Sequence, residues 1–399
     1  MIVALSAGRD APAQLRRRLA LDESSVRELL GRRPEGVGEL AVLATCHRTE
    51  LYATADGPQS EAVHALASLL PGLRPSDHQD LRILTGTEAV EHLFRVAAGL
   101  DSLVIGEPQI LGQVRRALLV AQEQGSAGPV MATVFGRAIR TGRRVRTRTP
   151  LGRVARSVGA IAVEHLSQQL HGLSGRTGVV VGAGEAASDA ARSLHRAGAT
   201  LTVVSRTHAS AQHLASQVEA EALAVEEMPR VFARSEFAVV AVSGGVLVRP
   251  HHLPARPAGE PFLVLDLSVP PAVDATGRDD VVLRSLEEIP GPRGPELSDA
   301  VVEAEALVRR EVLELGRWAD TRTSGPAIRD LRARAERLVR SEVAQALAGL
   351  DLTPEQAEKV SAMTMRIVNR LMHGPSTVLR DADPETRDLI VRMFGLDDS

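Results

Sequence analysis

Two short segments of this 399-residue chain carry residue types that could perform covalent and redox chemistry. The first contains Cys46, the only cysteine, where an apolar run breaks into polar side chains and then resumes. A free thiol has a pKa of about 8.5, and a cationic neighbour such as Arg48 or a protonated His47 favours the reactive thiolate. Cys46 is therefore a candidate nucleophile. A small buried hydrophobic residue at a strand end explains the composition equally well.

The second segment has the spacing Gly182-x-Gly184-x-x-Ala187 between an apolar strand and a helix. The glycines permit a tight turn and close approach of the backbone to a pyrophosphate, whose charge the helix N-terminus stabilises. NAD-binding sites place Asp or Glu after the second strand, whereas Arg206 stands here and favours a 2′-phosphate, which predicts NADPH. A solvent-facing loop is the alternative for Arg206. The predicted cofactor-binding residues are Gly182, Ala183, Gly184, Glu185, Ala186, Ala187, Ser205, Arg206 and Thr207.

Composition bounds the class of protein. With 399 residues, 44% apolar and 24% charged, the chain predicts a soluble globular protein of about two or three domains. We expect no signal peptide, no membrane-spanning segment and, with one cysteine, no internal disulfide, which favours the cytoplasm. No cluster of His, Cys or carboxylate residues has convincing metal-ligand spacing, so we expect no catalytic metal.

A local cluster of arginines contrasts with the net charge of −3. These arginines would contact phosphates if a nucleic acid is a partner, and a solvated helix face is the commoner alternative. Aromatic residues make up only 2% of the chain, so any RNA would be held by backbone and shape rather than by base stacking. The cluster comprises Arg137, Arg140, Arg143, Arg144, Arg146 and Arg148.

Residues 1-150 mix short strands and helices, which predicts a small α+β domain. Strands are predicted at Ile2–Ser6, Leu40–Thr45 and Glu50–Thr54, and the turn between the last two projects Cys46 from the end of a sheet. A helix is predicted at Thr87–Leu100. The segment Gly99–Gln113, with its glycines and a proline, is interpreted as a structured loop before a helix at Val114–Gln124.

Residues 151-295 alternate apolar strands with helices, which is typical of a doubly wound, Rossmann-type sheet. The predicted strands are Thr177–Val181, Leu201–Val204, Phe237–Val242 and Phe262–Leu267, with a helix at Ser188–Ala197.

Residues 296-399, after a linker-like Gly/Pro run, read as helical throughout, beginning with a long helix at Leu297–Trp318. Thr353 and Gln356 have the spacing of a helix-capping pair. The chain is thus a multidomain α/β protein whose helical end has little core of its own and predicts a homodimer. The apolar stripe behind that prediction is Ile328, Leu331, Ala335 and Leu338.

Three separated stretches resemble one family, the glutamyl-tRNA reductases. Thr45–Glu50 resembles the family's nucleophile motif, Ala98–Gln113 its long central signature, and Ile367–Arg380 its C-terminal segment. The resemblance spans nearly the whole chain. It implies a catalytic domain at 1-150 that recognises glutamyl-tRNA(Glu), an NADPH domain at 151-295 and a dimerisation domain at 296-399.

The resemblance also implies the reaction and the residues that perform it. The Cys46 thiolate would displace tRNA from the glutamyl ester, and hydride from NADPH would release glutamate 1-semialdehyde, the first step of tetrapyrrole synthesis. His92 matches an activity-critical histidine of the family, although a packed core histidine is its alternative from the residues alone. A transient complex with the aminotransferase that consumes the semialdehyde is also implied. The substrate-binding residues implied are Thr45, His47, Arg48, Ser102, Glu107, Pro108, Gln109 and Gln113.

The chain departs from the family pattern at a few positions. His47 stands where Asn is usual, and Pro271 where Arg is customary. The amino-terminal Ser-His-Lys-Thr-Ala-Pro stretch of the family appears here as residues 6–12, Ser-Ala-Gly-Arg-Asp-Ala-Pro. Two other functions stay open: a Rossmann oxidoreductase that acts on a free small acid, and a non-catalytic tRNA-binding or regulatory relative.

Overall fold

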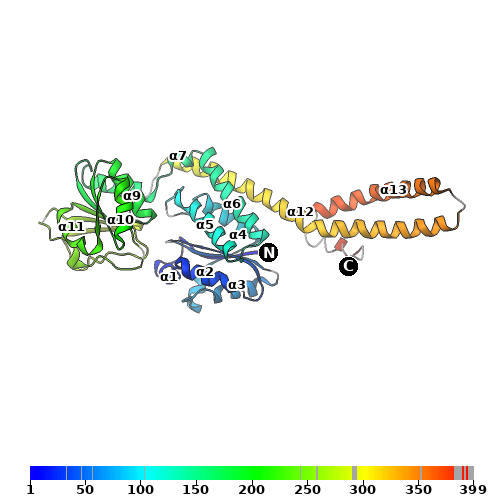
Figure 1. Ribbon diagram of the computed structural model, residues 1–399, viewed down its shortest axis with the longest axis horizontal. Helices are drawn as coiled ribbons and strands as arrows, with labels where there is room; N and C mark the ends of the chain where they lie inside the picture. The colour runs from blue at the N-terminus through cyan, green and yellow to red at the C-terminus, as the bar shows by residue number, and fades with distance from the viewer. Residues whose placement is uncertain are drawn as a thin grey trace. The chain divides into compact units, whose positions relative to one another are not determined.

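The computed structural model describes residues 1–399 except 33, 46, 56, 103, 243, 258, 290–293, 351–352, 382–388, 391 and 394–399. The side chains of 287, 320–330, 377 and 379–381 also lie outside the description. The chain forms two compact units, Met1–Val312 and Leu313–Ser399. The first unit contains both β-sheets, and the second is helical (Figure 1).

The N-terminal sheet has four antiparallel strands in the order β2-β3-β1-β4. The predicted pairing of the second and third strands is confirmed, with Ala44 opposite Thr49. The edge strand β4 was not predicted, because it is short and its side chains are exposed or only half-buried. The four strands are β1 Ile2–Ala7, β2 Val37–Ala44, β3 Thr49–Ala55 and β4 Arg82–Thr85.

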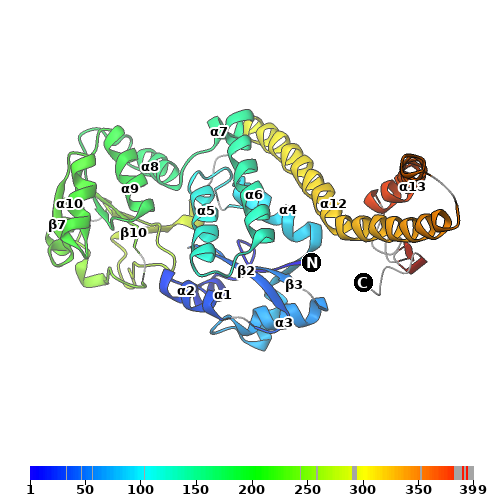
Figure 2. The same cartoon turned by 45° about the vertical axis from the view of Figure 1, so that its right-hand side comes forward.

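Three helices pack on one face of this sheet: α4 (Gly86–Ala97), α5 (Gln109–Glu123) and α6 (Pro129–Arg148) (Figure 2). The helix α3 (Gln59–Ser68) lies on the other face (Figure 1). The apolar residues of α4 recur on one side and are buried, which is why this segment folds as a helix against the sheet.

The loop predicted at Gly99–Gln113 is shorter in the structure, because α5 begins at Gln109. Pro108 precedes the first turn of α5. At this position the backbone N–H is not needed for a helical hydrogen bond, so its absence in proline costs nothing. Gly106 has φ of +79°, and a Cβ atom there would lie 2.4 Å from the Ala155 Cβ. The loop thus requires glycine for both its backbone conformation and its packing.

The second sheet has six parallel strands in the order β10-β9-β8-β5-β6-β7, so the predicted Rossmann-type fold is confirmed. Helices α8 (Val158–Gln169), α9 (Glu185–Arg196) and α10 (His208–Gln217) cover one face, and α11 (Met228–Arg234) packs on the other. The strands are β5 Thr177–Val181, β6 Thr200–Ser205, β7 Glu221–Ala224, β8 Phe237–Val240, β9 Phe262–Asp266 and β10 Val281–Ser285.

The helix α12 (Pro295–Ala348) is far longer than the segment predicted from the sequence. Its first part belongs to the first unit, where Ala300, Ala304 and Val308 are buried at helical spacing. Glu305 of α12 bonds Arg95 of α4 at 2.7 Å. The start of α12 is therefore fixed to the helix layer over the N-terminal sheet.

In the second unit, the remainder of α12 runs beside α13 (Pro354–Asp381), and Arg332 Nε donates to Ser376 Oγ at 3.3 Å. The predicted capping pair is confirmed: the Thr353 N–H donates to Gln356 Oε1, and the Gln356 N–H donates to Thr353 Oγ1. Within the predicted stripe, Leu331 is buried and Leu338 is exposed, while the Ile328 side chain lies outside the description.

The remaining helical segments are short. They are α1 Ala13–Arg18, α2 Glu23–Gly31, α7 Leu151–Val154 and the 3₁₀ turns at Pro75–Asp80, Val225–Glu227, Pro250–His252 and Leu286–Glu288.

Candidate active site

A fully buried carboxylate, Glu50 on β3, lies at the centre of the N-terminal site. Its Oε1 accepts hydrogen bonds from Ser6 Oγ at 2.9 Å and from an Arg48 guanidinium nitrogen at 3.0 Å. Its Oε2 accepts from the Tyr52 hydroxyl at 2.7 Å. Arg48, Glu50 and Tyr52 alternate along the chain, so their side chains share one face of the strand.

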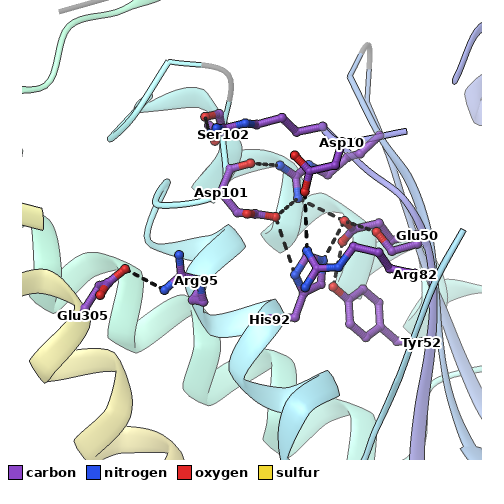
Figure 3. Close-up of polar contacts among 12 residues, drawn as sticks. Asp10, Glu50, Tyr52, Arg82, His92, Arg95, Asp101, Ser102 and Glu305 are labelled. Carbon is purple, nitrogen blue, oxygen red and sulfur yellow. Dashed lines mark hydrogen bonds and ion pairs between the residues drawn. The ribbon is translucent and has the colours of Figure 1, made fainter. Parts of the chain in front are cut away.

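His92 on α4 joins this cluster from the opposite side. Its Nε2 lies 2.9 Å from Glu50 Oε1, and its Nδ1 lies 3.6 Å from Asp101 Oδ2. Figure 3 shows the ring between these two carboxylates. His92 is 4% exposed, as a packed core histidine would be, but both of its ring nitrogens face acidic partners that fix the ring orientation.

The charges of this cluster stabilise one another. Burial alone would raise the pKa of Glu50, but the charges of Arg48 and His92 and the accepted hydrogen bonds outweigh burial and hold this pKa well below its usual value. Burial and the charge of Glu50 raise the pKa of Tyr52 well above its usual value. Burial lowers the pKa of Arg48, but the negative charges of Glu50 and Asp101 outweigh burial and raise this pKa above its usual value. At neutral pH Glu50 is thus an ionised acceptor and Tyr52 a neutral donor.

The candidate nucleophile Cys46 lies outside the described residues, and its neighbours define the turn around it. The Thr45 N–H donates to the Arg48 carbonyl at 2.9 Å, and the His47 N–H donates to Thr45 Oγ1 at 3.2 Å. Arg48, two residues after Cys46 in the chain, also belongs to the Glu50 cluster.

The central signature loop contributes Ser102 and Glu107. Ser102 is 3% exposed, and its hydroxyl has no hydrogen-bond partner among the described residues. A buried hydroxyl without a partner indicates a place where a ligand would bond. Val104, between these two residues, packs into the core under α8 and α9. The loop therefore contacts the nucleotide-binding sheet as well as the N-terminal one.

Glu107 is half-buried and carries a perturbed carboxyl group. Burial and the negative charge of Glu185 raise its pKa to about 7, although the charge of Arg48 opposes the shift. Its backbone carbonyl accepts a bond of 2.6 Å from Arg146 on α6. Carboxyl groups that titrate near neutral pH are common in functional sites.

The other predicted substrate residues lie around α5. Gln113 lines a cavity of about 160 Å³ together with Val42 and Ala44, at the end of β2. Gln109 opens α5, and Pro108 before it is exposed. Within the described residues, no hydrogen bond connects the Gln109 or Gln113 side chain to Glu50.

Sequence reasoning overlooked four residues of this cluster. A two-residue period starting at Arg48 points to Glu50 and Tyr52, and this signal was available from the sequence. Ser6 and Asp101 come from β1 and from the signature loop, so only their position in the fold connects them with Glu50.

The second site is a cavity of about 400 Å³ at the carboxyl ends of the parallel strands. Most of the predicted cofactor residues line it, namely Gly182, Ala183, Gly184, Glu185, Ala186, Ser205, Arg206 and Thr207. Ala187 is buried beneath the loop and does not line the cavity. Pairing across β5 to β6 and β8 places this cavity where the strand order reverses.

The turn after β5 has the geometry that a pyrophosphate needs. Gly182 has φ of +119°, and a Cβ there would lie 2.1 Å from the Ala241 carbonyl oxygen. Gly184 caps α9, and nothing lies within 4 Å of the place where its Cβ would stand. The helix N-terminus is therefore accessible to an anion, as dinucleotide binding requires. This observation shows that the residues present fit a nicotinamide dinucleotide.

These features define an oxidoreductase with a nicotinamide dinucleotide domain and a separate, charged catalytic site. Models of three families match the chain: the glutamyl-tRNA(Glu) reductase N-terminal domain at 6–149, shikimate/quinate 5-dehydrogenase at 164–290, and the glutamyl-tRNA(Glu) reductase dimerisation domain at 303–396. The chain belongs to the glutamyl-tRNA reductase family, which confirms the family predicted from its motifs.

Individual relatives extend over most of the chain. The chain is 35% identical to glutamyl-tRNA reductase of Rubrobacter xylanophilus over 385 residues, covering 93% of this chain and 90% of the relative. It is 36% identical to the Myxococcus xanthus reductase over 397 residues, with coverage of 94% and 88%. The solved glutamyl-tRNA reductase of Methanopyrus kandleri is 26% identical with a TM-score of 0.51, and the match covers 98% of this chain and 97% of that one.

Two absences apply to the described part of the chain. None of its helices combines the length and hydropathy that a bilayer crossing needs. It holds no group of three or more His, Cys, Asp or Glu side chains arranged to bind a metal ion.

Proposed function

We propose that this chain reduces the glutamyl group of glutamyl-tRNA(Glu) to glutamate 1-semialdehyde and releases the tRNA, the first step of tetrapyrrole synthesis. Family membership supports the reaction. The observation that carries the proposal for this chain is that one compact unit holds both a dinucleotide cavity and the buried Glu50 cluster, and Arg48 of that cluster follows Cys46 by two residues in the chain.

The reaction proceeds in two steps. The Cys46 thiolate attacks the ester carbonyl carbon, a C–S bond forms, and the C–O bond to the tRNA ribose breaks as the ribose oxygen takes up a proton. The residues that line the dinucleotide cavity would hold NADPH, which would supply a hydride. The acyl carbon accepts it, the C–S bond breaks, and the aldehyde leaves with the Cys46 thiolate restored. Covalent capture divides one difficult reduction into two easier steps.

The residues around Cys46 bind and orient the glutamyl group. The unpartnered Ser102 hydroxyl and the half-buried Glu107 carboxylate bind it, with Glu107 opposite the α-ammonium group. Arg48 supplies positive charge toward the γ-carboxylate while Glu50 and Asp101 hold its guanidinium in place. His92 acts beside the ester with its ring fixed between the same two carboxylates. Thr45, His47, Pro108, Gln109 and Gln113 form the remaining walls.

The cofactor is NADPH rather than NADH. Arg206 lines the cavity just after β6, and no described carboxylate pairs with it. Ser205 and Thr207 beside it are neutral, so the end of β6 carries no negative charge that would repel a 2′-phosphate. A guanidinium can bind that phosphate by charge-assisted bonds.

The tRNA lies along α6. This helix contains no Asp or Glu, and Arg140, Arg143 and Arg148 are exposed without an ion pair to any described residue. Arg144 instead pairs with Glu311. Arg146 on the same helix bonds the Glu107 backbone, which connects the helix to the glutamyl site. Phosphates next to the 3′ end would therefore meet unpaired guanidinium groups.

The protein acts as a cytoplasmic homodimer that associates transiently with the aminotransferase consuming the semialdehyde. The dimerisation-domain match supports the dimer. On α13, large apolar side chains are exposed at helical spacing, and a second copy would cover them. Light scattering at micromolar concentration tests this, because a monomeric full-length chain contradicts it. These side chains are Val360, Met363, Ile367, Leu371 and Val378.

The decisive experiment uses purified protein, glutamyl-tRNA labelled in its glutamyl group, and NADPH. We expect semialdehyde formation that requires charged tRNA and, when NADPH is omitted, labelled protein that hydroxylamine releases. Turnover of free glutamate or another small acid would indicate a different oxidoreductase. Binding of tRNA without acylation or turnover would indicate a non-catalytic relative.

A further inference from the structure

A second buried carboxylate lies in the nucleotide-binding sheet, in a different sheet from Glu50. Asp266 ends β9 and is 2% exposed. Its Oδ1 accepts the N–H of Ser268 at 3.0 Å, and its Oδ2 accepts the N–H groups of Ala272 at 2.7 Å and Val273 at 2.9 Å. One side chain therefore fixes both ends of the loop that follows β9.

Burial raises the pKa of Asp266, and its bonds with Ser268, Ala272 and Val273 oppose that shift. These donors stabilise the carboxylate form inside the protein, where an ion without partners would be costly. A buried carboxylate with all its bonds directed at one loop indicates a role in holding that loop.

The same loop forms one wall of the cofactor cavity through Leu267, Ser268 and Val269. Ser268 Oγ accepts the Val242 N–H at 3.1 Å and donates to the Val240 carbonyl at 3.4 Å. The Leu267 N–H also donates to the Val240 carbonyl, at 2.8 Å. The wall is thus hydrogen-bonded to the end of β8. Through this wall, the buried carboxylate stabilises the ends of both β8 and β9.

The position of this wall identifies the part of the cofactor that it faces. The turn at Gly182–Ala187 fits the pyrophosphate, and the end of β6 with Arg206 fits the ribose phosphate of the adenosine half. The nicotinamide half must extend the other way from β5, toward β8 and β9. The wall at Leu267–Val269 therefore meets the half of the cofactor that transfers hydride.

We propose that Asp266 is a positioning residue that holds the Leu267–Val269 wall against the nicotinamide half and so aligns hydride transfer to the acyl group on Cys46. The proposal rests on the proposed function. Asp266 itself does not line the cofactor cavity. Its removal would leave three N–H groups without their acceptor and release the wall, and a displacement of about 1 Å in a reacting group can slow a reaction about 100-fold.

The test separates the two chemical steps in full-length Asp266→Asn protein. Asparagine keeps the volume but turns an NH₂ group toward N–H donors, so the loop loses bonds. We expect hydride transfer in a single turnover to slow by about 10- to 100-fold and the Kd for NADPH, measured by fluorescence, to rise. Acylation by glutamyl-tRNA without NADPH should keep its wild-type rate. Asp274→Asn is the matched control, since Asp274 bonds Thr276 in an exposed turn outside the cavity.

A second variant covers the case in which Asp266→Asn fails to fold. Ser268→Ala removes only the hydroxyl link to β8, and it should slow hydride transfer by a smaller factor with acylation unchanged. Unchanged hydride transfer and NADPH affinity in the folded variants would overturn the proposal, as would an equal loss in both steps. If the wild type is never acylated, the proposed function fails instead, and the NADPH titration still tests whether Asp266 shapes the cavity.

Discussion

The two sites of the first unit are constructed in different ways. The cofactor cavity is built from loops that follow neighbouring strands, and the residues that suit it to a pyrophosphate are the glycines Gly182 and Gly184. The catalytic cluster is built from side chains of two strands, a helix and a loop that meet at Glu50. Backbone sites have short sequence signatures, whereas clusters of buried charges depend on long-range packing. Substitutions should therefore affect the two sites differently.

The largest effect should follow from Cys46→Ser. An alcohol is a far weaker nucleophile than a thiolate at neutral pH, so we expect semialdehyde formation to fall by at least about 1,000-fold. NADPH affinity should stay within about twofold, because the cavity lies in the other sheet. Initial rates and fluorescence titration measure the two quantities. A variant that retains most of its reductase activity would exclude the thioester route.

Glu50→Gln should destabilise the N-terminal domain. Arg48 is 3% exposed and would lose its main buried counter-charge, and breaking such a pair costs about 3–5 kcal/mol. Thermal unfolding followed by circular dichroism should show a lower midpoint for this domain. The control is Glu61→Gln, which removes the same charge from an exposed position on α3 and should change stability by less than about 0.5 kcal/mol. Equal midpoints in the two variants would show that the cluster adds little stability.

Arg206→Ala tests the cofactor site through a single side chain. Loss of a charge-assisted bond to the 2′-phosphate should raise the KM for NADPH by about 10- to 100-fold and leave that for NADH nearly unchanged. Arg230→Ala, an exposed change in the same domain outside the cavity, is the control. Equal losses for both cofactors would assign Arg206 a general role rather than phosphate recognition.

The arginines of α6 test whether the catalytic domain also holds the tRNA body. Replacing Arg140, Arg143 and Arg148 together by Gln should weaken glutamyl-tRNA binding uniformly. The slope of log K against log salt should become smaller by about 2 to 3, because each phosphate contact contributes about 0.7–0.9. Filter binding at several salt concentrations measures this slope.

A matched triple variant in the nucleotide domain serves as the control for tRNA binding. Arg196, Arg230 and Arg284 are exposed, and replacing them by Gln removes the same charge. If both triple variants reduce the salt slope equally, net charge rather than the α6 surface attracts the tRNA.

The smallest predicted effect links the two sites through pH. The proposed contact with the α-ammonium group needs Glu107 as a carboxylate, so kcat/KM for glutamyl-tRNA should rise as the pH passes through about 7. Glu185→Gln removes a negative charge that raises the pKa of Glu107, so this rise should move to lower pH. The α-amino group of the substrate titrates in the same way with the wild type and with the Glu185→Gln variant. The difference between the two pH profiles therefore reports on Glu107 alone. Superimposable profiles would show that Glu185 does not influence Glu107.

Sequence patterns predicted most of the fold. The strands β5, β8 and β9 are buried apolar runs, and they were placed within two residues of their observed ends. Edge strands β4, β7 and β10 were not predicted, because each is short and partly exposed. The start of α5 was also placed late, since a turn of helix after Pro108 resembles a Gly/Pro loop in composition.

The sequence by itself determined the cofactor loop and the family, because the loop and each of the family's motifs consist of residues close together in the chain. Only the tertiary structure decided that Ser6, His92 and Asp101 meet around Glu50 and Arg48. It also decided that the Ser102 hydroxyl is buried without a partner and that Asp266 holds a wall of the cofactor cavity. The physical reason is that burial and charge pairing depend on distances across the fold, which local patterns do not encode.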